Sequence, residues 1–334
     1  MRGRGRVPVV ALTGYLGAGK TSLLNHLLRR PGARVGVVVN DFGTLNVDAA
    51  LVTGQVDDAA AISGGCVCCL EDAGGLDDAL RRLAQPRLRL DAILVEASGA
   101  ADPIAVARLI GFSRAGNIRP GGLVEVIDAV EHFATVDRWP EPPARYAAAT
   151  LVVVNKVDLV DEAVLARIRE RVRRRHPHVQ IVTARHSRID PALVFDTAAD
   201  EDPVDQLPLA RLIREQNPDR HDHEHARAAS VELVRPVSPS ALIDLLEDPP
   251  AGAYRLKGRV RVQGAQGFVV DVVGSLIHVT PLKEPPPVGE LVAIGMDLDP
   301  SVAQQRLETV ASAPADQPDA AGLRRLRRYR RLSA

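Results

Sequence analysis

The stretch Gly14-Tyr-Leu-Gly-Ala-Gly-Lys-Thr21 constrains the fold of this chain more than any other part of its sequence. It matches the pattern Gly-x-x-x-x-Gly-Lys-[Ser/Thr], whose backbone curls so that successive N–H groups point at phosphate oxygens. The apolar run Val7–Leu12 precedes it and a helical stretch, Lys20–Arg30, follows it, which is the context that this motif requires. A glycine-rich turn without a ligand is the alternative. We predict a phosphate loop whose nucleotide-binding residues are Gly14, Gly17, Ala18, Gly19, Lys20, Thr21 and Ser22.

Short apolar runs alternate with helical stretches beyond this loop, as far as Val182. The runs are rich in Val, Ile and Leu, which is typical of strands covered on both faces. Further strands are predicted at Val35–Asn40, Asp91–Glu96, Gly122–Ile127, Leu151–Val154 and Val179–Val182, and further helices at Gly75–Leu83, Pro103–Gly111 and Asp161–Arg175. The alternation predicts an α/β fold over residues 1–195, a P-loop NTPase domain with a mostly parallel sheet flanked by helices.

A second pattern follows a polar stretch over residues 196–229, which we interpret as a linker with one helix at Leu207–Gln216. Residues 230–322 are predicted to form a smaller α+β domain. Its strands are predicted at Val231–Val234, Tyr254–Val262, Gly267–Val273, Ser275–Thr280 and Glu290–Gly295, and its helices at Ser238–Leu246 and Pro300–Ala311. Residues 323–334 are predicted to be a basic tail, and the run Arg324–Arg331 a solvated terminus, with contact to RNA or an acidic partner as the alternative.

Composition excludes few functions. The 42 Lys and Arg residues balance 42 Asp and Glu residues, so net charge gives no reason to expect nucleic acid as a partner. No apolar run approaches the roughly 18–20 residues of a membrane-spanning helix. A signal peptide at the basic N-terminus is rejected, because the apolar stretch leads directly into the phosphate loop. We expect a cytoplasmic protein with no membrane partner, and leave a homodimer open.

A magnesium-binding nucleotide site also needs a carboxylate, and Glu96 is the candidate. It ends the predicted strand Asp91–Glu96, and ligands of parallel sheets lie at the carboxyl ends of strands, whereas Asp91 lies at the opposite end. We predict that Glu96 orients magnesium-bound water and that the N–H of Gly99 contacts the γ-phosphate. The alternative for Glu96 is an acidic residue that stabilises a helix start.

The tetrad Asn155-Lys156-Val157-Asp158 follows the strand Leu151–Val154 and predicts recognition of guanine. Asp158 would accept hydrogen bonds from the ring N–H and the amino group of guanine, and adenine lacks that pair of donors. A carboxylate left unpaired by adenine would cost on the order of 1–3 kcal/mol. Asn155, Lys156 and Asp158 are therefore predicted to bind GTP. Thr183-Ala184, after the strand Val179–Val182, is placed to pack against the guanine base.

All cysteines of the chain lie in one cluster, Cys66-Val-Cys68-Cys69. Thiolates favour soft or borderline ions such as Zn²⁺, Co²⁺ or Cu⁺, and three ligands leave a coordination position open for transfer of the ion. A redox thiol pair and small buried side chains are the alternatives. The tract His221-Asp-His223-Glu-His225 is interpreted equally well as a metal-collecting arm or as a solvated linker.

These motifs, together with Asn40-Asp41-Phe42-Gly43, Gly64-Gly65, Glu96-Ala-Ser-Gly99 and Asp102-Pro103, stand in the order seen in the CobW family of metal-handling GTPases. The region from Ser230 onward, with Arg235-Pro236 and Arg255-Leu-Lys-Gly258, resembles the C-terminal domain of that family. The family is similar to the nickel accessory GTPases for urease and hydrogenase. Family members usually carry Glu where this chain has Asp41, whose shorter side chain could contact a metal through water.

The resemblance implies a GTP- and Mg²⁺-dependent chaperone for Zn²⁺ or Co²⁺ that hands its metal to a client protein. Lys20, Thr21, Asp41 and Glu96 would be the catalytic residues, with Thr21 and Asp41 near the Mg²⁺. Cys66, Cys68 and Cys69 would bind the transferred metal. The competing hypotheses are a regulatory or assembly GTPase whose cysteines sense redox state, and a binding module that does not hydrolyse GTP.

Overall fold

The computed structural model describes residues 6–28, 33–40, 59–62, 74–195, 226–263, 266–313 and 319–332, with the backbone alone at 40, 59–62, 74 and 332. These residues form two compact units, one from Arg6 to Phe195 and the other from Ala226 to Leu332. No helix in the described ranges is both apolar enough and long enough to cross a lipid bilayer.

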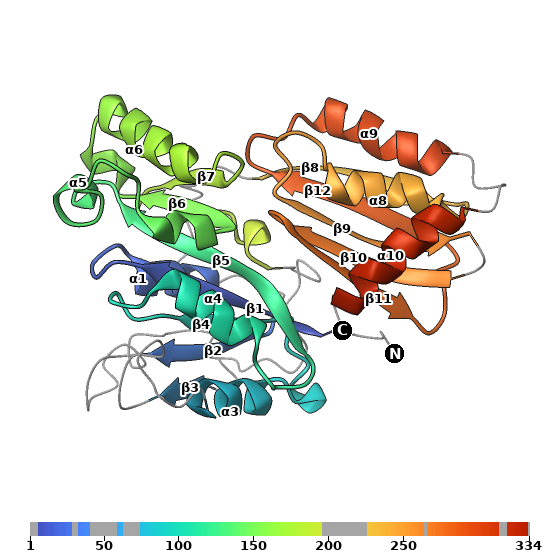
Figure 1. Ribbon diagram of the computed structural model, residues 1–334, viewed down its shortest axis with the longest axis horizontal. Helices are drawn as coiled ribbons and strands as arrows, with labels where there is room; N and C mark the ends of the chain where they lie inside the picture. The colour runs from blue at the N-terminus through green and yellow to red at the C-terminus, as the bar shows by residue number, and fades with distance from the viewer. Residues whose placement is uncertain are drawn as a thin grey trace, which may run out of the picture. The chain divides into compact units, whose positions relative to one another are not determined.

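The first unit is built on a sheet of seven parallel strands in the order β3-β2-β4-β1-β5-β6-β7 (Figure 1). The strands are β1 Val7–Gly14, β2 Val35–Asn40, β3 Ala59–Ile62, β4 Ala92–Glu96, β5 Ile118–Asp128, β6 Leu151–Asn155 and β7 Gln180–Ala184. Their continuous apolar runs fill a core on both faces of the sheet, and Val9, Ile93 and Val152 are fully buried within it. Burial of one such side chain stabilises the fold by about 1.5–3 kcal/mol.

Five helices belong to this unit in the described ranges: α1 Lys20–Leu28, α3 Gly74–Leu83, α4 Pro103–Gly111, α5 His132–Thr135 and α6 Glu162–Arg175. Short 3-10 turns lie at Pro86–Leu88, Ala144–Ala148, Val157–Leu159 and Pro191–Leu193. Helix α4 begins after Asp102, whose side chain accepts a hydrogen bond from Ile104 N, with Pro103 at the first helical position. Aspartate caps and prolines at that position satisfy or remove the free N–H groups of a helix start.

The predicted α/β architecture is confirmed, and all six predicted strands of the first unit are present. Strand β3 was not predicted, because Ala59-Ala-Ala-Ile62 is mostly alanine and has only one of the β-branched residues that mark a strand. Strand β1 lies between β4 and β5, so the order of the strands changes direction there. The carboxyl ends of these three strands meet at one edge, which is where such sheets bind ligands.

The second unit is an antiparallel sheet in the order β11-β10-β9-β12-β8, together with three helices. Its elements are β8 Arg227–Leu233, α8 Pro239–Glu247, β9 Arg255–Val262, β10 Gln266–Val273, β11 Leu276–Leu282, β12 Gly289–Gly295, α9 Pro300–Ser312 and α10 Ala320–Leu332. In β9, buried Leu256, Val260 and Val262 alternate with less buried polar residues, as expected when one face covers a core. Strand β8 begins before the predicted domain start at Ser230.

The prediction of a basic tail over residues 323–334 is wrong for its described part. Residues 320–332 form α10, and Leu326, only 1% exposed, lies in the core of the second unit. Leu323 and Tyr329 pack against the same core. Sequence analysis overlooked that Leu323, Leu326 and Tyr329 recur at helical spacing among the arginines. These three side chains are enough to pack one face of the helix against the core.

Candidate nucleotide-binding site

The phosphate loop links β1 to α1 and depends on glycines at defined positions. Gly14, Gly17 and Gly19 have φ angles of 141°, 79° and 102°, which side-chain-bearing residues rarely adopt. A Cβ atom on Gly14 would lie 2.3 Å from the carbonyl oxygen of Val126, and one on Gly19 would lie 2.4 Å from Asn155 Nδ2. The loop is therefore held by backbone conformation and by close packing against β5 and β6.

Lys20 begins α1 and is only 7% exposed. Its Nζ donates a hydrogen bond to the carbonyl oxygen of Tyr15 at 3.1 Å, so the ammonium group lies across the loop. A helix N-terminus and a lysine at the same place concentrate positive charge, which favours a bound phosphate. Next to Lys20, Thr21 is partly buried, whereas Ser22 is exposed.

The structure brings Thr21 and Glu96 together. Thr21 Oγ1 donates a hydrogen bond to Glu96 Oε1 at 2.6 Å, and Glu96 is 3% exposed at the end of β4. Parallel pairing aligns Glu96 with Leu12 of β1, just before the phosphate loop. A hydroxyl and a carboxylate at this place are oxygen ligands of the kind that Mg²⁺ prefers, directly or through water.

Gly99 lies directly against the phosphate loop. A Cβ atom on Gly99 would stand 2.5 Å from the backbone nitrogen and 2.9 Å from the Cα of Leu16. These are backbone atoms, so they cannot rotate away as the end of a flexible side chain would. Only glycine therefore allows the turn after β4 to approach the loop this closely.

Asn155 joins the end of β6 to the phosphate loop and is 2% exposed. Its Nδ2 donates hydrogen bonds to the carbonyl oxygen of Ala18 at 2.9 Å and to Ser187 Oγ at 2.8 Å. Its Oδ1 accepts from the backbone nitrogen of Ser187 at 2.8 Å. Ser187 Oγ in turn donates to the carbonyl oxygen of Gly19 at 3.1 Å. The amide of Asn155 thus holds the phosphate loop and the turn after β7 together.

Lys156 and Asp158 lie on the turn that follows β6. Lys156 has a left-handed φ of 63°, and its Nζ donates a 2.6 Å hydrogen bond to Asp128 Oδ2 at the end of β5. Asp158 lies in the 3-10 turn Val157–Leu159, and its side chain is exposed. Asp128 thereby fixes the lysine, while the carboxylate of Asp158 is accessible to a base.

Two of these partners, Ser187 and Asp128, were missed by sequence analysis. Ser187 follows β7 in a left-handed conformation, beyond the Thr183-Ala184 pair that was expected to back the base. The one sequence signal for Asp128 was its position as a polar residue directly after the apolar run of β5.

A buried ion pair supports the start of the phosphate loop. Thr13 Oγ1 donates to Glu125 Oε2 at 2.6 Å, and Arg145 Nε donates to Glu125 Oε1 at 2.5 Å. Glu125 is 2% exposed, and the Arg145 guanidinium also lies 4.6 Å from the centre of the Tyr15 ring. A buried carboxylate is tolerated only when it is paired in this way, so removal of Arg145 would leave a charge uncompensated.

A second polar cluster stabilises the chain between β5 and β6. His132 Nε2 lies 2.6 Å from Tyr146 Oη and 3.7 Å from Asp137 Oδ2, and Arg171 binds Asp137 with Nε and Nη2. Burial lowers the pKa of His132 to about 4, although the Asp137 carboxylate acts in the opposite direction. Burial also raises the pKa of Tyr146 above its usual value. Both side chains are therefore neutral at physiological pH.

Several predicted site residues lie outside the described residues: Asp41, Cys66, Cys68, Cys69, His221, His223 and His225. Within the described part of the chain, no group of His, Cys, Asp and Glu side chains is arranged to hold a metal ion. The metal assignment of the cysteines stays a prediction.

Comparison with known proteins gives two family matches. Residues 8–183 match the family described as "CobW/HypB/UreG, nucleotide-binding domain", and residues 226–311 match "Cobalamin synthesis protein cobW C-terminal domain". The first match extends from β1 to β7 and thus includes every described residue of the nucleotide site except Ser187.

Two relatives and one solved structure are similar over most of the chain. "Zinc chaperone CobW" of Sinorhizobium sp is 26% identical in an alignment 311 residues long, which covers 82% of this chain and 87% of that protein. "Zinc chaperone YjiA" of Escherichia coli K12 is 29% identical in an alignment 274 residues long, which covers 77% of this chain and 83% of that protein. The crystal structure of Zn(II)-bound YjiA GTPase from E. coli is 22% identical, with a TM-score of 0.44 and coverage of 92% and 99%. Since the nucleotide-binding match covers more than half of its residues, this chain belongs to the CobW/HypB/UreG family and carries the CobW C-terminal domain.

Proposed function

We propose that this chain is a GTP-dependent metal chaperone that binds Zn²⁺ or Co²⁺ and hands it to a client protein. The observation that carries the GTP-binding part is the hydrogen bond from Asn155 to the carbonyl oxygen of Ala18, because it joins the guanine tetrad to the phosphate loop. Both relatives described above are named zinc chaperones, which supports the proposal that this chain binds a metal and favours zinc as that metal.

Nucleotide binding is proposed to use groups already in place. The N–H groups of the loop from Gly14 to Gly19 and the ammonium of Lys20 bind the phosphates. Lys20 would exchange its contact with the Tyr15 carbonyl for phosphate oxygens. Asp158 accepts two hydrogen bonds from guanine, and Asn155 and Lys156 hold that end of the site in shape.

Magnesium is the expected cofactor, and Thr21 and Glu96 fit it because their oxygens already lie 2.6 Å apart beside the loop. A bound Mg²⁺ would supply charge stabilisation to the phosphates. Thr21 Oγ1 would then turn a lone pair towards the ion, and Glu96 would accept hydrogen bonds from ion-bound water. Asp41 is proposed as a further carboxylate of this shell, and Gly99 N–H as a γ-phosphate contact.

Metal transfer is proposed to depend on Cys66, Cys68 and Cys69, which lie between β3 and α3 in the sequence. Zinc or cobalt is here the cargo, and three thiolates leave a position for a group of the receiving protein. Bound GTP would stabilise one conformation of residues 40–48 and of the cysteine segment, and hydrolysis would release both. By linkage, nucleotide and metal must then change each other's affinity by the same factor.

Anaerobic calorimetry tests this coupling. Zn²⁺ and Co²⁺ are titrated into the full chain with a non-hydrolysable GTP analogue or with GDP bound. We expect a difference in metal affinity of about 5–150-fold between the two nucleotides. The variant Cys66→Ser/Cys68→Ser/Cys69→Ser should lose the tight site, whereas the control His221→Gln/His223→Gln/His225→Gln should keep it. Equal affinity with both nucleotides would contradict the chaperone function and leave a redox-sensing GTPase.

Nucleotide selectivity is tested separately. Asp158→Ala should weaken GTP binding by roughly 5–150-fold, as a lost hydrogen-bonded carboxylate costs about 1–3 kcal/mol, and should leave ATP binding unchanged. Phosphate release from GTP by the wild type, measured with and without Zn²⁺, tests hydrolysis. Absence of any release, even with metal, would identify a binding module instead of an enzyme.

A further inference from the structure

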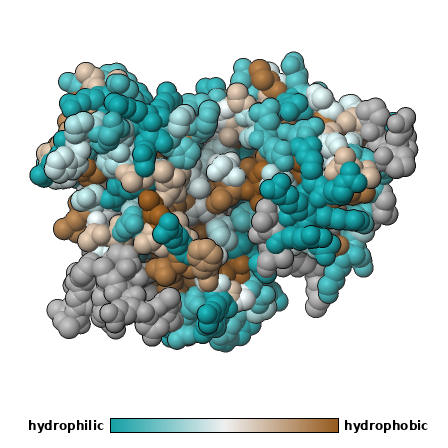
Figure 2. All heavy atoms as spheres, viewed as in Figure 1, coloured by the Kyte–Doolittle hydropathy of each residue, from teal (hydrophilic) through white to brown (hydrophobic). Residues whose placement is uncertain are grey.

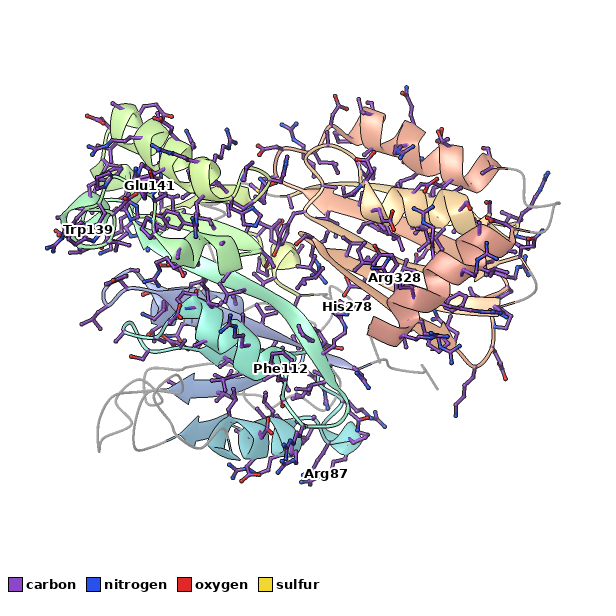
Figure 3. The ribbon with its side chains drawn as sticks, viewed as in Figure 1. Arg87, Phe112, Trp139, Glu141, His278 and Arg328 are labelled. Carbon is purple, nitrogen blue, oxygen red and sulfur yellow. The ribbon has the colours of Figure 1, made fainter. Side chains whose placement is uncertain are left out.

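Helix α10 carries six arginines: Arg324, Arg325, Arg327, Arg328, Arg330 and Arg331. Arg325 is bound to α8, donating from Nη1 to Asp244 Oδ1 at 2.7 Å and from Nη2 to Glu247 Oε2 at 2.6 Å. The other five are exposed and form no ion pair with any described residue. Figure 2 shows this part of the surface as strongly hydrophilic, and Arg328 is labelled in Figure 3. We call these five residues the arginine face.

The helix that presents the arginine face is firmly docked. Asp319 precedes α10 and accepts hydrogen bonds from Gly322 N at 2.8 Å and from Ser240 N at 2.7 Å. A Cβ atom on Gly322 would lie 2.3 Å from that same Ser240 nitrogen, so the two helices touch. Tyr329 Oη donates to Glu247 Oε1 at 3.0 Å. The charges are therefore displayed on a rigid element, which reduces the entropy lost when they bind a partner.

Two classes of partner fit this surface poorly. An amphipathic helix enters a membrane surface through its apolar side, but that side of α10 is already buried, with Leu326 1% exposed. A protein partner normally contributes apolar or aromatic anchors that need a matching surface. The large exposed hydrophobic residues described in this unit, Val234, Val288 and Val302, all lie outside α10.

We propose that the arginine face of α10 binds the phosphate backbone of double-stranded DNA without reading its sequence. Guanidinium groups bind phosphates through paired N–H donors, and such binding needs no apolar anchor. Arg324, Arg327, Arg328 and Arg331 follow one side of the helix over about 10 Å, at 1.5 Å per residue. Each strand of duplex DNA presents roughly one charge every 3.4 Å, a spacing that four arginines over about 10 Å can follow. A single strand fits less well, because its binding relies on stacking aromatic residues and the arginine face has none.

This surface belongs to the second unit, whereas the nucleotide site belongs to the first, and it lies outside the residues that the family matches cover. The C-terminal match ends at residue 311, before α10 begins. The chain as a whole has no net charge, so the charge of α10 is local and does not reflect a generally basic protein. The proposal does not depend on metal transfer.

Fluorescence anisotropy with a labelled duplex of about 20 base pairs tests the proposal on the full chain. We expect micromolar binding near 50 mM salt and a roughly 500-fold loss near 200 mM, from about five phosphate contacts. Arg324→Gln/Arg327→Gln/Arg331→Gln should weaken binding at least tenfold and make the salt slope shallower by about 3. The matched control Arg173→Gln/Arg174→Gln/Arg175→Gln removes three exposed charges from α6 and should bind as the wild type.

Each of four results would overturn the proposal. The first is no binding of duplex DNA by the wild type near 50 mM salt, and the second is an equal loss of affinity in both triple variants. The third is tighter binding to duplex RNA, single-stranded DNA or anionic vesicles than to duplex DNA. The fourth is tighter binding to poly-glutamate than to duplex DNA. Unchanged circular dichroism and thermal unfolding of the α10 variant will show that any loss comes from charge, since Arg325 and the packed face are retained.

Discussion

The side-chain amide of Asn155 donates a 2.9 Å hydrogen bond to the carbonyl oxygen of Ala18, so the residue that opens the guanine tetrad is part of the phosphate-loop scaffold. Its remaining hydrogen bonds go to Ser187 Oγ and Ser187 N. We therefore propose that Asn155 is a positioning residue and that Asp158 contacts the base. This division makes the effects of the tetrad residues separable.

Asn155→Ala should weaken GTP, GDP and ATP binding to similar extents. The change leaves the Ala18 carbonyl and the Ser187 backbone nitrogen without their partner, which costs about 1–3 kcal/mol, or roughly 5–150-fold in affinity. Titration of fluorescent nucleotide analogues measures it. Asp158→Ala is the comparison, because it should affect guanine alone. A loss in Asn155→Ala confined to guanine nucleotides would show that Asn155 contacts the base directly.

Thr21→Ala should reduce magnesium-dependent GTP binding and hydrolysis, because it removes the hydroxyl that lies 2.6 Å from Glu96. Loss of a group that orients a metal shell typically costs about 10–100-fold. Thr21→Ser keeps the hydroxyl and should retain activity. Affinity for GTP measured with Mg²⁺ and with EDTA checks the assignment. The hydroxyl would have no such role if Thr21→Ala and Thr21→Ser behaved alike.

Gly99→Ala should impair nucleotide binding although it adds only one methyl group. The new Cβ would meet the Leu16 backbone nitrogen at 2.5 Å, so the phosphate loop or the turn after β4 must move. Gly111→Ala is the matched control, because nothing lies within 4 Å of a Cβ atom there and the residue ends α4. The control should bind nucleotide normally and gain up to about 0.5–1 kcal/mol of stability. Similar nucleotide affinities in both variants would argue against the close packing of Gly99 on the loop.

His132 should make the folded protein less stable as the pH falls from about 6.5 to about 4. Burial lowers the pKa of His132 to about 4 in the folded state, against 6.5 for an unperturbed histidine. Within this window the unfolded chain binds a proton that the folded chain does not, so stability rises with pH by up to about 1.4 kcal/mol per unit.

Urea unfolding of the wild type and of His132→Gln at several pH values measures this contribution. The variant should show a shallower loss of stability below pH 6.5, whatever its stability at neutral pH. An unchanged slope in His132→Gln would mean that other groups dominate the acid dependence.

The sequence by itself determined the elements whose signals are local. Continuous apolar runs specify buried strands, and the glycines, Lys20 and Thr21 specify a phosphate loop, because neighbouring residues alone impose these conformations. Asp158 was likewise identified from its immediate neighbours, Asn155 and Lys156. The cysteine cluster was also evident in the sequence, and its metal remains a prediction.

Only the tertiary structure decided which distant residues support the site. Ser187, Asp128 and the Glu125–Arg145 pair reach the loop or its neighbours because strand order places β5, β6 and β7 on one side of β1. No spacing in the sequence encodes that order. Helix α10 shows the same limit: its charge predicted a solvated tail, whereas packing of Leu326 on a core formed by strands and helices far along the chain made it an ordered helix.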